Sequence, residues 1–274
     1  MISKKYSIIE KLSQGAFGTV YKAENVRTKE LVAIKFEQNN STFKNLKNEA
    51  KIYQYLGRLE GFPQLKMYGQ IDQLNYMVIE LLGIPLSKMI QHYHALSLKT
   101  TLILGCQIVR RIQTLHQKHL LHRDIKPSNF IFGIGNKTNK LHLIDFGLSK
   151  QYIPSEEEHP ISNIIGSPNF VSLNVHNHIE PTKRDDLESC VYVILTMLFG
   201  KLEWFNKTSI DEIYLLKKDI ISYEEVPMFV KTMIQYIRSL SHDDEPDYNY
   251  LVDVMMRCFV QNEFVSDNKF EWSV

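Results

Sequence analysis

The sequence predicts an α+β fold, with an N-terminal antiparallel β-sheet that carries one helix and a mainly helical C-terminal lobe. Over roughly the first 80 residues, short runs of β-branched and aromatic residues alternate with Gly or polar turns, as in successive strands. Beyond them, apolar residues recur at three- and four-residue steps, which is the spacing of amphipathic helices. We therefore expect an N-terminal lobe over residues 1–80, a hinge at 81–84 and a C-terminal lobe over 85–274.

Each element follows from its local pattern. The strand-like runs cover residues 6–12, 19–24, 31–37, 65–68 and 76–80. Between the third and fourth of these, the pattern changes to helical spacing over residues 42–56. The C-terminal lobe should contain long helices at residues 98–117, 186–199, 228–240 and 250–260.

Charge and composition exclude several classes of protein. The 32 Lys and Arg residues nearly balance the 31 Asp and Glu residues, so no bulk field would attract nucleic acid or an anionic membrane surface. The longest apolar stretch, residues 191–200, is about half the length needed to cross a bilayer and predicts a buried helix. The start has no apolar signal region, and the three Cys are far apart, which predicts buried structural thiols. We expect a monomer in the cytoplasm, with the nucleus as an alternative location.

A glycine-containing hairpin is the first feature with chemical meaning. Gly15 and Gly18 lie between two predicted strands, where the backbone could approach the phosphates of a nucleotide closely. Such a hairpin is by itself more often a simple turn. Lys35, at the end of Val-Ala-Ile-Lys, precedes Glu49 of the following helix by 14 residues, so that Glu49 could hold the ammonium group beside the phosphates. A solvated surface pair remains the alternative for these two residues.

Two later motifs strengthen the nucleotide hypothesis. Leu-His-Arg-Asp-Ile-Lys-Pro-Ser-Asn places Asp124 five residues before Asn129, and Asp145 follows a short apolar run in Leu-Ile-Asp-Phe-Gly. Mg²⁺ prefers hard oxygen ligands that it shares with phosphates, so Asn129 and Asp145 are chemically suitable ligands. Four ordered motifs indicate phosphoryl transfer far more strongly than any one of them.

Together these motifs resemble those of the eukaryotic protein kinases, and several longer sequence segments are similar to those of the casein kinase I family. The similarity to casein kinase I is carried by Val-Ala-Ile-Lys-Phe-Glu at 32–37, Glu-Leu-Leu-Gly at 80–83, Ile-Asp-Phe-Gly-Leu-Ser-Lys at 144–150 and Lys-Arg-Asp-Asp-Leu-Glu-Ser at 183–189. Ser-Leu-Asn at 172–174 stands where most protein kinases carry Ala-Pro-Glu. The resemblance covers nearly the whole chain and implies a two-lobed protein kinase fold.

The resemblance also implies a role for each site residue. Asp124 would accept or orient the proton of the substrate hydroxyl, and Lys126 would stabilise the transferred phosphoryl group and favour Ser or Thr as substrate. Asn129 and Asp145 would bind Mg²⁺, while Lys35 and Glu49 would set the nucleotide. The phosphates of ATP would lie against the glycine loop at Gly15 and Gly18, and its adenine ring would lie in a site made of Leu12, Val20, Ala33, Ile79 and the hinge from Glu80 to Leu82. Asp186 would hold the amides of the catalytic loop, and the Ser167 hydroxyl would bond to Asp124 and Lys126. The expected activity is ATP-dependent, non-specific serine/threonine protein kinase activity on acidic protein substrates.

Three positions depart from the family pattern. Ser13 replaces the first glycine of the phosphate loop, and Ser128 replaces the aspartate that is common before the metal-binding asparagine. Asn169 stands where casein kinase I usually has an arginine that binds a phosphate already present on the substrate. These departures leave a preference for prephosphorylated substrates open. Two other functions also remain: a pseudokinase scaffold without turnover, and a kinase that acts on a small molecule.

Overall fold

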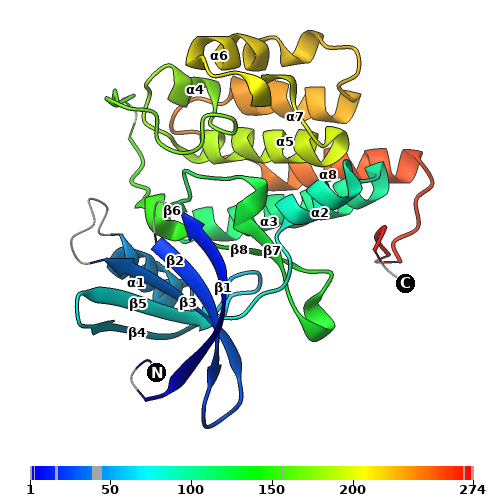
Figure 1. Cartoon of the computed structure of the whole chain (residues 1–274). Coiled ribbons are helices and arrows are strands. Elements are labelled where there is room, and N and C mark those ends of the chain that lie inside the picture. The colour runs from blue at the N-terminus through cyan, green and yellow to red at the C-terminus, as the bar shows by residue number, and fades with distance from the viewer. Residues whose placement is uncertain are drawn as a thin grey trace. The chain divides into compact units, whose positions relative to one another are not determined.

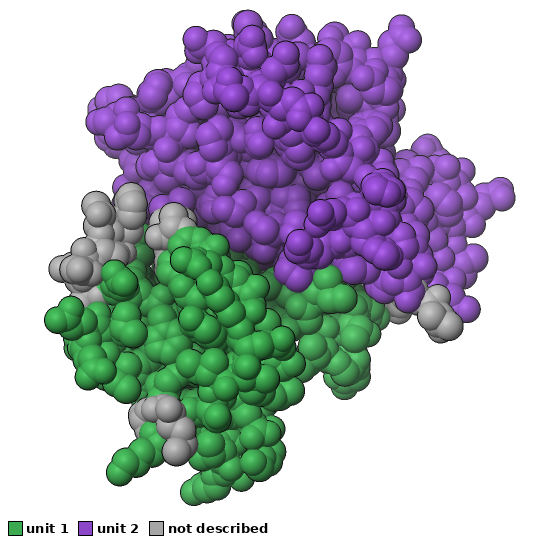
Figure 2. All heavy atoms as spheres, in the orientation of Figure 1, with its two compact units in different colours: residues 1–84, 131–147 green, residues 85–130, 148–274 purple. Residues whose placement is uncertain are grey.

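The computed structural model describes residues 2, 4–15, 18–38, 45–155, 157–267 and 269–272. Residues 42–44 of the predicted first helix and residues 16 and 17 of the glycine loop lie outside these ranges. The chain forms two compact units, which Figure 2 shows in different colours. Unit 1 comprises residues 1–84 and 131–147, and unit 2 comprises residues 85–130 and 148–274.

Unit 1 is built on a five-stranded antiparallel sheet with the strand order β1-β2-β3-β5-β4 (Figure 1). Its strands are β1 (Tyr6–Gly15), β2 (Gly18–Asn25), β3 (Leu31–Gln38), β4 (Leu65–Ile71) and β5 (Leu74–Glu80). Helix α1 (Leu46–Leu56) packs against β4 and β5. The unit also contains the short 3₁₀ helix η2 (Gly135–Lys137), strand β8 (Leu141–Leu143) and most of its partner β7 (Phe130–Phe132).

One face of this sheet is a closed apolar layer, because strand residues two apart point to the same side. Its buried side chains are Ile2, Tyr6, Ala23, Val32, Ile34, Tyr76 and Val78. The opposite face carries Val20, Ala33, Lys35 and Ile79, which are aligned by the pairs Val20 with Lys35 and Ala33 with Ile79. Directly opposed residues of antiparallel strands share a face. The register therefore brings four of the predicted nucleotide-site residues onto one surface of unit 1.

Unit 2 is a set of packed helices. They are α2 (Leu86–Tyr93), α3 (Leu98–Gln117), α4 (Leu173–His176), α5 (Lys183–Phe199), α6 (Ile210–Lys218), α7 (Met228–Ser239) and α8 (Tyr248–Gln261). Helix α3 packs against α5 and α8, and α7 packs against both α5 and α8. Shorter elements are η1 (Pro127–Asn129), the last residue of η3 (Phe146–Leu148), η4 (Glu203–Asn206), η5 (Ile220–Ser222) and the paired strands β6 (Leu120–Leu121) and β9 (Lys150–Gln151).

The α+β class predicted from the sequence is confirmed, and each predicted strand and long helix is present. Helix α5 begins three residues before its predicted start, because Thr182 and Asp185 form a reciprocal capping box there. Helix α6 was not predicted, although Ser209 caps it by accepting a hydrogen bond from the Glu212 amide, and Ser-x-x-Glu is a sequence signal for a helix start. Of the stretch predicted to be buried, residues 191–200, the part from 191 to 197 is buried within α5, whereas Phe199 is 38% exposed at the end of the helix.

The thiol prediction was correct for one cysteine. Cys190 is buried, whereas Cys106 and Cys258 are half-buried, because α3 and α8 each expose one side at those positions. In the part of the chain that the structure describes, no helix combines the length and the apolar character that a membrane crossing requires.

Gly200 ends α5 with a backbone that only glycine adopts easily. Its φ is 72°, and a Cβ at this position would lie 1.5 Å from the carbonyl oxygen of His94. We expect Gly200→Ala to destabilise the protein by about 1–2 kcal/mol through left-handed strain, with a further 1–3 kcal/mol from crowding. Urea unfolding would measure this. Gly135→Ala is the matched control, because its φ is 63° but a Cβ would meet nothing within 4 Å; an equal loss in both variants would contradict the crowding argument.

Candidate active site

In unit 1, a lysine whose side chain is 12% exposed lies between two carboxylates. Lys35 Nζ donates to Glu49 Oε2 at 2.7 Å and to Asp145 Oδ1 at 2.9 Å, and the Glu49 side chain is 3% exposed. Burial alone would lower the pKa of Lys35, but the two carboxylates raise it above its ordinary value. Burial raises the pKa of Glu49 to about 7 although Lys35 lowers it, so the Glu49 carboxylate depends on the ammonium group beside it to stay ionised. The predicted Lys35–Glu49 pair is therefore not a solvated surface pair.

Asp145 is held in an uncommon backbone conformation at the end of β8. Its φ is 68°, and its amide donates to Tyr53 Oη at 3.1 Å. The neighbouring Phe146 ring packs edge-on against Tyr53, with ring centroids 4.9 Å apart. Tyr53 lies one turn after Glu49 on α1. One face of this helix therefore contacts both Lys35, through Glu49, and Asp145, through Tyr53. Left-handed non-glycine residues are uncommon, and here the surrounding contacts hold one in place.

Glu37 was not identified from the sequence as part of this arrangement. Its carboxylate Oε1 accepts hydrogen bonds from the amides of Asn45, at 2.9 Å, and Leu46, at 3.1 Å, and its residue is 5% exposed. Asn45, at the N-cap of α1, makes no capping bond with its own side chain. Strand β3 thus supplies both Glu37, which caps α1, and Lys35, which binds Glu49 farther along the same helix. The sequence contains only a weak signal for this capping role, because a glutamate in a strand can also form an ion pair or lie exposed to solvent.

The remaining predicted nucleotide-site residues of unit 1 lie in the sheet and at its end. Gly18 has φ 123°, and a Cβ there would lie 2.0 Å from the Phe36 carbonyl oxygen, so packing requires glycine whether or not a nucleotide binds. No atom lies within 4 Å of a Cβ at Gly15, so Gly15 is free of this constraint. Leu12 is half exposed on β1. After Glu80 and Leu82, the Gly83 amide donates to the Phe132 carbonyl oxygen at 2.7 Å, which fixes the hinge backbone.

In unit 2, Asp124 is surrounded by donors. Its Oδ1 accepts from the Ser167 amide at 3.0 Å and from Ser167 Oγ at 2.8 Å, while Oδ2 accepts from Lys126 Nζ at 2.6 Å. Lys126 Nζ also donates to Ser167 Oγ at 3.1 Å. The contacts expected of Ser167 are therefore present. Asp124 is buried but fully hydrogen-bonded, so its carboxylate is held in one orientation.

Asn129 meets the chemical requirement for a hard-cation ligand. Its Nδ2 donates to the Asp124 carbonyl oxygen at 2.8 Å, which fixes the amide and makes Oδ1 the atom that could bind a cation. Asp145, in unit 1, carries a carboxylate, which is also a hard oxygen donor. Among the described residues, no group of three or more His, Cys, Asp or Glu could hold a metal. Asn129 and Asp145 are each by their chemistry suited to Mg²⁺, which retains waters and phosphate oxygens as further ligands.

The loop that carries Asp124 depends on a second buried carboxylate, Asp186 of α5. Its Oδ2 accepts from the His122 amide at 2.7 Å and its Oδ1 from the Arg123 amide at 2.9 Å, as predicted. His116 Nε2 also lies 3.0 Å from Oδ2, a contact that the sequence did not suggest. Arg123 has φ 65°, so these bonds hold a strained backbone immediately before Asp124.

Removing the Glu37 cap should weaken the attachment of α1. We expect Glu37→Ala to lower the free energy of unfolding by about 1 kcal/mol, the usual cost of a lost helix cap, and to weaken ATP binding because α1 carries Glu49. Urea unfolding and ATP titration would measure both effects. Glu10→Ala is the control, since Glu10 is an exposed strand residue paired with Lys22. Equal behaviour of the two variants would refute the capping role.

Asp186→Asn should destabilise unit 2 in a pH-dependent way. Burial alone would raise the pKa of Asp186, but hydrogen bonds from His116 and the backbone amides lower it below 3.8. A lowered carboxylate pKa contributes stability above the unfolded pKa, and this is lost as the pH falls through the folded pKa. Between pH 7 and pH 5, the free energy of unfolding of Asp186→Asn, measured in urea, should be about 1.5–3 kcal/mol lower than that of the wild type. This difference between the two proteins should become smaller below pH 3.8, where the wild type loses the stabilisation by its carboxylate. A difference that is the same at all pH values would contradict the assignment.

The chain was compared with models of known protein families. The model of the protein kinase domain matches residues 6–261, which is nearly the whole chain. The matched range includes the two residue clusters described above, the one around Lys35 in unit 1 and the one around Asp124 in unit 2. The chain therefore belongs to the protein kinase family and is an ATP-dependent protein kinase.

Proposed function

We propose that this kinase transfers the ATP γ-phosphate to Ser or Thr hydroxyls of proteins and is a member of the casein kinase I group. The observation that carries the proposal is the contact of Lys126 Nζ with both Asp124 Oδ2, at 2.6 Å, and Ser167 Oγ, at 3.1 Å. A lysine two residues after the catalytic aspartate is typical of serine/threonine kinases, and this contact places its charge beside the group that would orient the hydroxyl.

Each residue of unit 2 then has a distinct task. Asp124 orients the substrate hydroxyl and accepts its proton, while Lys126 stabilises the negative charge that develops on the transferred group. Because Ser167 donates twice to Asp124 Oδ1, the carboxylate keeps its orientation without help from the substrate. Such positioning provides most of the catalysis in phosphoryl transfer, since the chemistry itself needs little covalent help.

The residues of unit 1 would bind the nucleotide. Lys35 would contact its phosphates while Glu49 keeps the ammonium in place, and the adenine ring would lie against Leu12, Val20, Ala33, Ile79 and the hinge backbone from Glu80 to Leu82. Asn129 and Asp145 would hold Mg²⁺. When bound, the metal neutralises negative charge on the phosphate oxygens.

A contact between two family-specific segments supports the casein kinase I assignment. Ser172 Oγ and Asn174 Nδ2 both donate to Asp185 Oδ1, at 2.6 and 3.0 Å. Ser172 and Asn174 belong to the Ser-Leu-Asn that replaces Ala-Pro-Glu, and Asp185 belongs to Lys-Arg-Asp-Asp-Leu-Glu-Ser. In this chain, one carboxylate thus joins the two segments.

For substrates, we propose acidic proteins that need no prior phosphorylation. The Asn169 side chain provides no charge where the family arginine would bind a phosphate. The backbone carbonyl oxygen of Asn169 accepts a hydrogen bond from Trp204 Nε1 at 2.9 Å. Loss of a charge-assisted contact of that kind typically costs about 1.5–3 kcal/mol of affinity.

Phosphate transfer to protein would test the proposal directly. With Mg-ATP labelled in the γ-position, the wild-type chain should label casein on Ser or Thr, and Asp124→Asn should lower kcat by about 10²–10⁴-fold, because the general base is lost. Paired peptides with and without a preceding phosphoserine should react at rates within about threefold of each other. Equal ATP binding by both proteins would show that the variant is folded.

Each other outcome would reject a defined part of the proposal. Label on Tyr would reject the hydroxyl specificity, and a strong preference for the phosphorylated peptide would reject the substrate assignment. ATP binding without transfer to any protein would favour a scaffold, and transfer to a metabolite alone would favour a small-molecule kinase.

A further inference from the structure

The loop of residues 166–171 in unit 2 precedes helix α4 and contacts the catalytic aspartate, Asp124, through hydrogen bonds. It has no regular secondary structure, and Ser167 within it makes the two hydrogen bonds to Asp124 Oδ1 described above. At its start, Gly166 has φ 105°, and a Cβ there would lie 2.4 Å from the Arg123 carbonyl oxygen. The position of this loop therefore decides whether Ser167 reaches Asp124.

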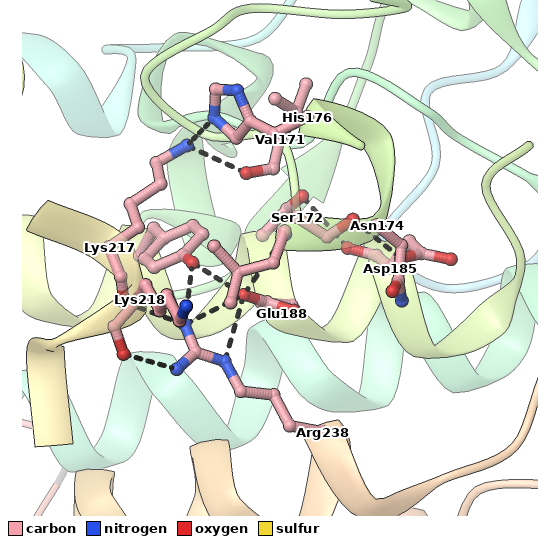
Figure 3. A network of polar contacts seen from close by, with 12 residues as sticks. Val171, Ser172, Asn174, His176, Asp185, Glu188, Lys217, Lys218 and Arg238 are labelled. Carbon is pink, nitrogen blue, oxygen red and sulfur yellow. Dashed lines mark hydrogen bonds and ion pairs between the residues drawn. The ribbon is translucent and has the colours of Figure 1, made fainter. Parts of the chain in front are cut away.

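Side chains from outside the loop hold three of its carbonyl oxygens. Lys217 Nζ donates to the carbonyl oxygens of Pro168 and Val171, both at 2.7 Å, and Trp204 Nε1 donates to that of Asn169 at 2.9 Å. Figure 3 shows the Lys217 amine directed at Val171 and His176. The loop is mostly half-buried, with Val171 buried, and donors from side chains satisfy carbonyl groups that have no helix or sheet partners.

Lys217 is unusually buried for a lysine, with 0% of its residue surface exposed. Its amine also lies 3.1 Å from His176 Nε2, 4.7 Å from the ring centroid of Tyr192 and 5.9 Å from that of Trp204. Burial lowers the pKa of Lys217 well below its ordinary value, but the amine meets three acceptors and lies near two aromatic faces, and these contacts favour its charged form. Burial and the nearby lysine lower the pKa of His176 to about 4, so its ring is neutral and can accept at neutral pH.

The backbone of Lys217 is itself fixed by a neighbouring ion pair. Arg238 of α7 donates to Glu188 Oε1 at 3.1 Å and to the Lys217 carbonyl oxygen at 2.8 Å, at the end of α6 (Figure 3). Glu188 also accepts from Tyr192 Oη at 2.6 Å. The ammonium group is thus presented to the loop by packed helices rather than by a mobile surface side chain.

We propose that Lys217 is a positioning residue for phosphoryl transfer. The two hydrogen bonds from its side-chain amine fix the loop of residues 166–171, so that Ser167 keeps Asp124 in the orientation needed for the substrate hydroxyl. Lys217 itself touches neither substrate nor nucleotide. The inference rests on the proposed function and extends it to a residue 50 positions after Ser167 in the sequence.

Lys217→Met tests this, because methionine is also long and unbranched but has no donor. After normalisation to the number of ATP sites per chain, we expect kcat to fall about 10–100-fold, the effect of a small misplacement of catalytic groups, with ATP affinity unchanged within twofold. A purely structural role would lower the number of ATP sites and leave the normalised kcat unchanged. Should Lys217→Met not fold, Lys217→Gln replaces it. Glutamine has two donors for three acceptors and is one atom shorter, so the normalised kcat should still fall by at least about threefold, and an unchanged value would overturn the proposal.

A double-mutant cycle shows whether Lys217 acts through Ser167. Ser167→Ala removes the hydroxyl bond to Asp124, and if both residues act on the same carboxylate, the double variant should be about as slow as the slower single variant. Effects on kcat that multiply would overturn the proposal, as would an unchanged normalised kcat in Lys217→Met.

Lys183→Met is the matched control. Lys183 is also buried, pairs with Glu245 and lies 5.1 Å from the ring centroid of Tyr152, with no hydrogen bond to the loop of residues 166–171 among the described contacts. Its normalised kcat should stay within twofold of wild type. If Lys183→Met lost as much as Lys217→Met, the effect would come from removing any buried lysine, and the proposal would fail. A wild-type chain without transfer would instead overturn the proposed function.

Discussion

The buried carboxylate of Asp186 is the constraint on which the catalytic part of unit 2 depends. A buried negative charge is stable only when donors surround it, and here two donors are the amides of His122 and Arg123. Those bonds maintain the left-handed backbone at Arg123, and the next residue is Asp124. Helix α5 therefore holds the backbone that leads into the proposed base, although it contributes no group to the chemistry itself.

The same physical device recurs wherever the backbone is irregular. Glu37 of β3 caps α1, Asp185 binds Ser172 and Asn174, and Lys217 binds the carbonyl groups beside Ser167. In each case, a charged side chain from one element satisfies polar groups of another and is shielded from water. Charge-assisted bonds of this kind are short and directional, so they fix position as well as add stability. Regular helices and strands thus determine the geometry of loops that carry the proposed site.

Prediction from the sequence succeeded where local spacing carries the information. Periodicity placed the strands and the long helices, and the fixed intervals among Lys35, Glu49, Asp124, Asn129 and Asp145 were enough to indicate phosphoryl transfer. The roles of Glu37, His116 and Lys217 could not be predicted in this way. Each is a common residue type in an ordinary helix or strand, and its partners lie far away in the sequence or are backbone atoms, which leave no residue-specific signal.

The sequence by itself determined the α+β class, the order of elements and the residue types of the candidate site, because periodicity and motif spacing are local properties. Tertiary structure decided that residues 131–147 join the N-terminal strands, so that Asp145 reaches Lys35. It also decided that a lysine of α6 would be buried among carbonyl groups rather than solvated. Such choices depend on which distant groups share a desolvated volume, and only the packed chain defines that volume.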